Sequence, residues 1–441
     1  MLALASLPGS GDPRQIEKLL NDMFPADWLR ETATTVGFVQ RQRKVDPVTF
    51  FWVLVLGFGV GVQRSLASLR RAYETAAGET LVPSAFYDRF HPKLVAFLRA
   101  CLTRGIDALV AHTSLALGEK LQGFKDLVVA DGTILRLHDQ LAPVFPGARH
   151  PAELKIHLVS GLTTNTKTVR LYPGKTAEIQ TLRVGAWVRD CILLFDLGSF
   201  KYQLFSRIRR NGGHFVSRLK DSANPTIVRV LRTHRGAARD LAGRRLREIR
   251  PGLQREVLDV AVAVTFRRRA DRGHTTPATE QFRLVGVRDP ETGAYHCYLT
   301  DLSPDPLSAE DVAQLYRARW SIELLFKELK RLYQLDVMTS AAPVVVEALV
   351  LTALLTLVVS HRVLNHLRRL VPAQAARFTP LRWAEVFAAA TIRLLPQVLA
   401  VAGVTDDPFW VMVFMMQEAP DPNVTRERLL DPWIQARSTE G

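Results

Sequence analysis

The order of strand-like and helix-like segments in the middle of the chain limits the possible fold more than any other feature of the sequence. Three segments with the apolar pattern of strands come first, and a helix, a strand, a second helix and a last strand follow. The strand-like segments are 124–137, 153–162, 167–172, 191–195 and 214–219, and the helical ones are 178–189 and 202–210. Meandering strands followed by alternating helices and strands are typical of an α/β protein with a mixed sheet. We therefore predict the α/β fold class.

Segments of other kinds flank this order and interrupt it. The first part of the chain and the part beyond Ser340 contain helical segments broken by Pro, Gly and polar clusters. In between lies a stretch that is rich in arginine from Arg229 to Arg250 and then alternates as a strand does from Val260 to Phe266. We therefore predict three further regions: a helical N-terminal region, 1–118, a β-rich insertion, 221–300, and a helical C-terminal region, 342–441.

The composition favours a polyanionic partner. Lys and Arg number 58 against 43 Asp and Glu, which gives a formal net charge of +15. Such an excess is typical of proteins that bind nucleic acid or an anionic membrane surface. In the N-terminal region, Arg41, Arg43 and Lys44 form one basic cluster, and Arg70 and Arg71 form another. Either cluster could face DNA phosphates, but such clusters are equally often solvated helix faces.

The apolar and cysteine content argues against a membrane or secreted protein. Residues 49–62 and 348–360 are apolar but shorter than the roughly 20 residues that a membrane span needs, so we expect buried core helices there. The N-terminus lacks a basic region before a long apolar stretch, and we expect no signal peptide. Three widely spaced cysteines, Cys101, Cys191 and Cys297, form no disulfide or zinc pattern. A reducing cytosol fits these features best.

A helix predicted from Ser308 to Leu335 carries the most specific pattern of polar residues. Tyr316, Arg319, Glu323 and Lys330 follow the spacing Y-x2-R-x3-E-x6-K. At 100° per residue, all four fall on one stripe about 60° wide. Apolar residues border the stripe and predict a buried face beside it: Leu315, Ile322, Phe326 and Leu329. The sequence from Ser308 to Asp311 resembles a capping box at the start of the helix.

This stripe allows two interpretations. A carboxylate framed by two cations and a phenol, at the edge of a core, suits a site that holds a metal and a phosphate. A surface helix with mixed charges gives the same spacing and is common. Glu328 lies well off the stripe, so we do not expect it to act with the other residues.

Two aspartates each follow an apolar strand-like segment. Asp131 follows Leu-Val-Val-Ala, and Asp196 follows Ile-Leu-Leu-Phe. Open α/β sheets place ligands at the carboxyl ends of their strands, so neighbouring strands would bring both carboxylates together. With Glu323 they would supply hard oxygen donors, which match Mg²⁺ or Mn²⁺ rather than zinc. Taken alone, either aspartate more often only opens a turn.

Four motifs together resemble the DDE transposases of the insertion-sequence-four family, to which the transposases of transposons five and ten belong. The motifs are Asp131-Gly-Thr133, Asp196-Leu-Gly-Ser-Phe200, His214 to Lys220, and Tyr316 to Glu323 continued to Lys330. The resemblance covers roughly residues 120–340. It implies a ribonuclease-H-like catalytic core, here 119–220 and 301–341, with the β-rich insertion between the second Asp and the Glu.

The resemblance also implies roles for individual residues. Asp131, Asp196 and Glu323 would be the catalytic metal ligands, with two Mg²⁺ or Mn²⁺ ions as cofactor. Phosphates of DNA would be held by Tyr316, Arg319 and Lys330. Trp320 would stack on an unpaired base, or would simply pack against the sheet.

The implied function is that of a transposase in a prokaryotic cytoplasm, associated with the nucleoid. We expect it to bind the terminal inverted repeats of its insertion sequence as a dimer, to cut there through a hairpin intermediate, and to join the ends to target DNA. Two alternatives remain: a ribonuclease-H-like DNA nuclease without transposition, and a catalytically silent DNA-binding relative. We do not expect a membrane protein.

Overall fold

The computed structural model describes most of the chain. The described ranges are 14–40, 45–58, 65–77, 81–112, 115–161, 167–232, 241–253, 255–269, 275–289, 291–331, 340–399 and 434–436. The predicted basic cluster at Arg41, Arg43 and Lys44 lies outside these ranges, as do residues 400–433 of the predicted C-terminal region.

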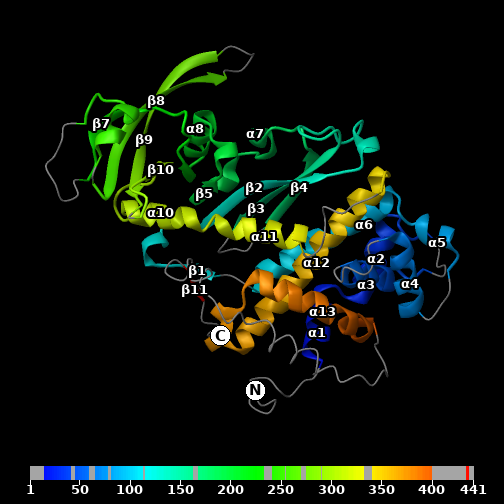
Figure 1. The fold of residues 1–441 in the computed structure, drawn as a ribbon. Coiled ribbons are helices and arrows are strands. Elements are labelled where there is room, and N and C mark those ends of the chain that lie inside the picture. Colours follow the sequence, from blue (N-terminus) through cyan, green and yellow to red (C-terminus); the bar gives the residue numbers. More distant parts are fainter. Residues whose placement is uncertain are drawn as a thin grey trace.

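A nine-stranded mixed sheet forms the centre of the molecule (Figure 1). Its strand order is β4-β3-β2-β5-β6-β10-β9-β8-β7. The strands are β2 (Asp126–Arg136), β3 (Glu153–Gly161), β4 (Lys167–Pro173), β5 (Cys191–Phe195), β6 (His214–Arg218), β7 (Thr226–Val230), β8 (Val257–Arg269), β9 (Thr275–Arg288) and β10 (Tyr295–Thr300). β2, β5 and β6 pair in parallel, and the other neighbours pair antiparallel. The five predicted core strands are therefore all present.

The strands of the predicted insertion continue this same sheet. β10 pairs antiparallel with β6, and β9, β8 and β7 follow it outward. In β8, the alternating residues Val260, Val262, Val264 and Phe266 are buried on one face, as their spacing predicts. The insertion thus shares its backbone hydrogen bonds with the core.

Helices cover both faces of the sheet and form the N-terminal region. They are α1 (Gln15–Met23), α2 (Ala26–Thr35), α3 (Pro47–Phe58), α4 (Leu66–Ala77), α5 (Pro83–Tyr87), α6 (Pro92–His112), α7 (Glu178–Thr181), α8 (Tyr202–Arg210), α9 (Leu246–Ile249), α10 (Ala309–Arg317), α11 (Trp320–Arg331), α12 (Pro343–Leu370) and α13 (Pro380–Leu399). A small antiparallel pair, β1 (Leu115–Leu117) and β11 (Ile434–Ala436), lies apart from the main sheet. The predicted α/β fold class is confirmed, with one large mixed sheet and helices on both the N-terminal and the C-terminal side of it in the sequence.

Two apolar clusters divide the core between the faces of the sheet. α8 packs on one face through Leu204, Phe205 and Ile208. α10 and α11 lie on the opposite face, where α6 and α12 also pack (Figure 1). A side chain on a core strand therefore faces either α8 or α11, depending on its place in the alternation.

α12 accounts for the second apolar run of the sequence. It is long and apolar enough to cross a membrane by length and composition, but 83% of its most apolar window is buried inside the protein. The residues of the first apolar run that the structure describes lie in α3, where Phe50 to Leu56 are also buried. Both observations agree with the expectation of core helices.

Three predicted elements differ from the structure. The segment predicted as one helix from Ser308 is two helices, because Ala318 and Arg319 form a tight turn with hydrogen bonds from their N–H groups to residues three positions earlier. The segment predicted as a strand over 124–137 is β2, but Asp131, expected at a strand end, lies inside it, because β3 pairs with β2 as far as Arg136. The helix predicted over 178–189 is only the single turn α7 followed by a 3₁₀ turn, Ala186–Val188.

Candidate active site

The register of the two central strands places Asp131 and Asp196 side by side. The last parallel pair between β2 and β5 joins Ala130 to Phe195. Asp131 and Asp196 are the next residues on the two chains. Neighbouring strands lie about 4.8 Å apart, so the backbones that carry these aspartates are close at this edge of the parallel pairing. The two aspartates therefore occupy neighbouring backbone positions, even though β2 runs on beyond Asp131.

Alternation along the strands then gives both aspartates the same face. Val129 and Leu194 belong to the apolar cluster on the α11 face, whereas Ala130 belongs to the cluster on the α8 face. Successive side chains of a strand point to opposite faces. The side chains of Asp131 and Asp196, two residues after Val129 and Leu194, therefore point to the same face as theirs, the face on which α11 lies.

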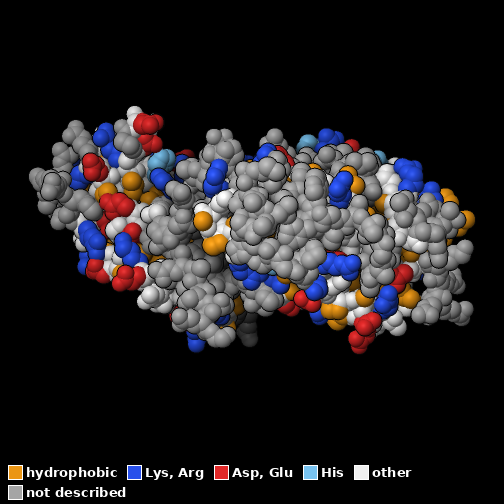
Figure 2. Space-filling view, turned by 90° about the horizontal axis from the view of Figure 1, so that it is seen from below, with side chains coloured by type: hydrophobic (Ala, Val, Ile, Leu, Met, Phe, Trp, Pro, Cys, Tyr) orange, Lys and Arg blue, Asp and Glu red, His pale blue; other side chains and the backbone are white. Residues whose placement is uncertain are grey.

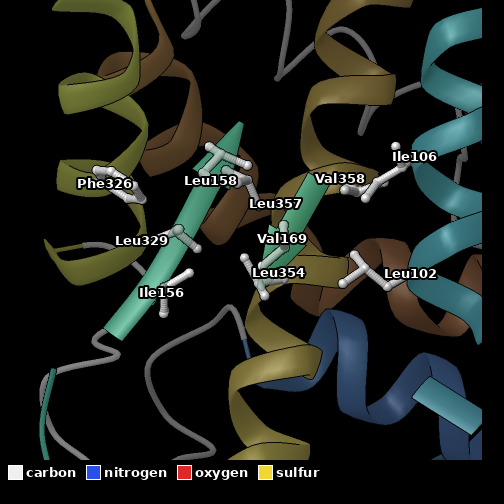
Figure 3. A pocket seen from close by; sticks show the side chains of 10 residues that line it. All are labelled: Leu102, Ile106, Ile156, Leu158, Val169, Phe326, Leu329, Leu354, Leu357 and Val358. Carbon is white, nitrogen blue, oxygen red and sulfur yellow. The ribbon is translucent and has the colours of Figure 1, made fainter. Parts of the chain in front are cut away.

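Apolar packing fixes α11 against that face. Phe326 and Leu329 of α11 are buried against β3, β4 and α12 around a cavity of about 20 Å³ (Figure 3). The cavity is lined only by apolar side chains, namely Leu102, Ile106, Ile156, Leu158, Val169, Phe326, Leu329, Leu354, Leu357 and Val358. It lacks the polar groups that would orient a ligand. The apolar side chains packed around it anchor the helix that carries Glu323.

Arg319 joins Glu323 to Asp131. Its Nη2 donates to Oε1 of Glu323 at 2.5 Å, and its Nη1 lies 3.5 Å from Oδ2 of Asp131. The exposed fractions of the three side chains are 12% for Arg319, 18% for Asp131 and 29% for Glu323. The guanidinium also lies over the ring of Tyr316, 5.5 Å from its centre. The structure therefore brings together two of the three predicted acids and two of the residues predicted to bind phosphate.

Asp196 acts on the same group electrostatically. Burial raises the pKa of the Tyr316 hydroxyl and the charge of Arg319 lowers it, while Asp196 raises it further, with a net upward direction. Burial alone would lower the pKa of Arg319, but Tyr316, the hydrogen bond to Glu323 and the charges of Glu323 and Asp196 raise it overall. A carboxylate influences these groups only from nearby. Asp196 thus belongs to the same electrostatic environment as Tyr316 and Arg319.

The two remaining predicted residues are described less fully. Lys330 is half-buried on α11, and its spacing from Glu323 corresponds to about two helical turns on the same side. Trp320 is the first residue of α11, but its side chain lies outside the described part of the structure. Glu328, which the sequence separates from the stripe, is buried and pairs with Nε2 of His361 on α12 at 3.0 Å.

The carboxylates of Asp131, Asp196 and Glu323 are of the kind that binds a hard cation, although in this structure two of them bind an arginine. Among the described residues, no three acidic, histidine or cysteine groups are close enough to hold a metal as they stand. Asp131 and Glu323 instead share the positive charge of Arg319. Carboxylate oxygens are the ligands that Mg²⁺ and Mn²⁺ prefer. The three acids therefore have donor atoms that suit such an ion, and they lie on the same face of the sheet. The guanidinium of Arg319 lies between two of them, Asp131 and Glu323.

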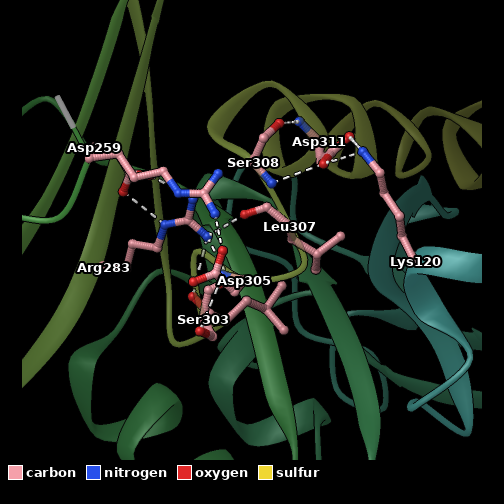
Figure 4. A network of polar contacts seen from close by, with 10 residues as sticks. Lys120, Asp259, Arg283, Ser303, Asp305, Leu307, Ser308 and Asp311 are labelled. Carbon is pink, nitrogen blue, oxygen red and sulfur yellow. Dashed lines mark hydrogen bonds and ion pairs between the residues drawn. The ribbon is translucent and has the colours of Figure 1, made fainter. Parts of the chain in front are cut away.

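A second polar network, which the sequence did not reveal, holds the start of α10 (Figure 4). Arg283 of β9 binds Asp259 of β8 through two contacts of 2.8 Å and donates to the carbonyl oxygens of Ser303 and Leu307. Ser308 caps α10 by accepting from the N–H of Asp311, and the Asp311 carboxylate pairs with Lys120 at 2.8 Å. The capping box was predicted. The acid Asp259 within the apolar first half of β8 was the available signal for the rest.

Comparisons with known proteins identify the family. A family profile described as "Transposase DDE domain" matches residues 122–359, which is more than half of the chain and includes all seven predicted site residues. The transposase for insertion sequence element IS231B of Bacillus thuringiensis subsp. berliner is 23% identical over 363 residues, covering 72% of this chain and 73% of the relative.

Two further proteins to which the chain is similar are also transposases. The transposase for insertion sequence element IS1151 of Clostridium perfringens is 20% identical over 73% of this chain and 75% of the relative. A solved piggyBac transposase synaptic complex with hairpin DNA aligns with 95% of this chain and 84% of that one, at 12% identity and a TM-score of 0.40. On the strength of the profile match, the chain belongs to the family of DDE transposases.

Proposed function

We propose that this transposase binds the terminal inverted repeats of its own insertion sequence, cuts DNA there and joins the freed ends to target DNA. The observation that carries the proposal is the convergence of Asp131, Glu323 and Arg319, with Asp196 on the same face of the sheet. Acids alone would suit many metal sites. An arginine and a tyrosine beside them add the groups that recognise a phosphodiester.

In the proposed mechanism, Asp131, Asp196 and Glu323 hold divalent cations, with Mg²⁺ or Mn²⁺ as the expected ion and two as the expected number. Such ions, when bound, supply an activated water or 3′-hydroxyl and stabilise the leaving 3′ oxygen. Arg319 grips a flanking phosphate with its fork of N–H donors, whereas Lys330 attracts it as a point charge. The Tyr316 hydroxyl donates a hydrogen bond to a phosphate oxygen.

Other parts of the proposal concern the DNA and the assembly. The helical N-terminal region is proposed to bind DNA, and two copies of the chain to bring the two ends together. The Lys and Arg side chains described on the face seen from below lie in several small groups next to Asp and Glu (Figure 2). Among the described residues of that face, the basic side chains therefore form no continuous DNA path. We place the protein in the prokaryotic cytoplasm with the nucleoid.

The excision route is proposed to pass through a hairpin at the transposon end. In that route the freed 3′-hydroxyl attacks the opposite strand, and a base that leaves the stack could rest on Trp320. Replacing Trp320 with Ala should then slow hairpin formation more than first-strand nicking. Equal slowing of both steps would make Trp320 a packing residue.

A cleavage assay on the natural DNA ends tests the function. Linear DNA with the inverted repeats that flank the gene is incubated with the protein and Mg²⁺, and strand products and joined products are separated. We expect cleavage and joining by the wild type, and background cleavage with retained DNA binding for Asp131→Asn, Asp196→Asn and Glu323→Gln. Glu310→Gln, which changes an exposed acid on α10, is the matched control and should cut normally.

The outcomes separate the candidate functions. Full cleavage by any of the three variants would remove that residue from the site. Cleavage without joining would favour a nuclease that does not transpose. Binding of the ends without metal-dependent cleavage would favour a silent DNA-binding relative.

A further inference from the structure

The guanidinium of Arg319 lies between two acids of the proposed metal site and supplies the positive charge there. Arg319 touches Glu323 at 2.5 Å and Asp131 at 3.5 Å, although these acids come from a helix and from a strand far apart in the sequence. Two carboxylates drawn toward one position repel each other unless a cation lies between them. In this structure the cation is Arg319.

The contacts of Arg319 leave part of its hydrogen-bonding capacity unused. A guanidinium has five N–H donors. Its Nε is buried and has no hydrogen-bond partner among the residues that the structure describes. The contact to Asp131 is at the upper limit for a hydrogen bond. A buried donor without an acceptor is unfavourable, so this arrangement favours a change of partner when a better acceptor arrives.

We infer that Arg319 substitutes for the divalent cation in the metal-free enzyme, and that cation binding releases it to grip the DNA backbone. This inference rests on the proposed metal site. Glu323 follows Arg319 by four residues, about one helical turn, so a rotation of the Arg319 side chain is sufficient to exchange carboxylate for phosphate. The tight turn at Ala318 and Arg319 places the arginine at the start of α11, next to Tyr316.

Such an exchange couples the two ligands. The cation must displace Arg319 before it binds both acids, which weakens cation binding in the absence of DNA. A phosphate that binds Arg319 removes the competitor and strengthens cation binding. By linkage, the cation must strengthen DNA binding by the same factor. The site would thus assemble fully only when the metal and the DNA are both present.

Direct titration with Mn²⁺ in the absence of DNA tests the competition. We expect Arg319→Met to bind Mn²⁺ about tenfold more tightly than the wild type, within the roughly 5- to 150-fold range of such couplings. Arg317→Met removes the same charge from an exposed position in the last turn of α10 and should change the affinity less than about twofold. Arg319→Lys keeps the charge and should resemble the wild type. An unchanged or weaker affinity in Arg319→Met would overturn the inference.

DNA binding measured with and without Mn²⁺ completes the test. The wild type should bind end DNA about tenfold more tightly with Mn²⁺ than without it, and Arg319→Met should lose most of that gain. An equal gain in both proteins would contradict the release of Arg319. Asp131→Asn and Glu323→Gln distinguish the two levels of failure: if neither weakens Mn²⁺ binding, the proposed metal site itself is wrong.

Discussion

Two arginine–carboxylate clusters in this chain have similar members and opposite properties. Arg283 and Asp259 are almost fully buried, with side chains 3% and 0% exposed, and bind each other through two contacts of 2.8 Å. Backbone carbonyl oxygens accept from the remaining side of the Arg283 guanidinium. Arg319 has one short contact, one long contact and a buried Nε without a partner among the described residues.

The difference separates an architectural arginine, Arg283, from Arg319, which we propose binds DNA. A buried charge whose donors are all satisfied stabilises one conformation and resists exchange. The Arg283 cluster joins β8 and β9 of the insertion to the loop before α10. The Arg319 cluster lies at the other end of the same helical segment and retains solvent contact and unused donors. We propose that Arg319, held by one short and one long contact beside two acids, is the arginine that exchanges partners.

The largest expected effect on stability comes from the buried cluster. Arg283→Met leaves Asp259 buried without its partner, and this should lower the free energy of unfolding by about 3–5 kcal/mol. Arg319→Met should lower it by about 1 kcal/mol or less, because its carboxylates remain in reach of water. Urea denaturation of both variants measures the contrast. Equal losses would break the distinction between the clusters, and the double variant Arg283→Met with Asp259→Leu should recover most of the loss.

A smaller effect is expected where α10 begins. Ser308→Ala removes the cap of the helix and should lower the free energy of unfolding by about 1 kcal/mol. Lys120→Met removes only an ion pair whose lysine is half-exposed, so its effect should be smaller. Denaturation of the two variants under the same conditions orders them. A larger loss for Lys120→Met would show that the pair, and not the cap, fixes this end of the helix.

The smallest effect is a pH dependence at the joint between core and insertion. A hydrogen bond with Asp301 raises the pKa of His214 at the start of β6, although burial opposes the shift. Because the pKa of the folded state is raised, the stabilisation is complete below the unfolded value of 6.5 and is lost as the pH rises through the folded value. The stability difference between wild type and His214→Gln should therefore shrink between about pH 5.5 and pH 8.5. A difference that grows would contradict the assigned direction.

The sequence predicted the elements of the core because their signals are local. Apolar alternation and turn residues identified β2 to β6, and the positions of Asp131 and Asp196 after apolar runs predicted their proximity. The break at Ala318 could not be foreseen, since a single tight turn leaves Tyr316 and Arg319 on one side as a continuous helix would.

Features that depend on residues far apart in the sequence could not be predicted from the periodicity of apolar residues. β2 continues past Asp131 only because β3 pairs with it there. The Arg283 cluster joins residues that are neighbours only across strands of the insertion. The contact of Arg319 with Asp131 bridges 188 positions of sequence. Spacing along a helix grouped Arg319 with Glu323, but it could not show that Arg319 also contacts Asp131.

Metal-directed cleavage of the polypeptide tests the central claim that Asp131, Asp196 and Glu323 form one cation site. Fe²⁺ replaces Mg²⁺, and ascorbate with peroxide generates hydroxyl radicals that cut the backbone next to the bound ion. We expect cuts close to positions 131, 196 and 323, lost in Glu323→Gln and retained in Glu310→Gln. Cuts elsewhere, or an unchanged pattern in Glu323→Gln, would contradict it.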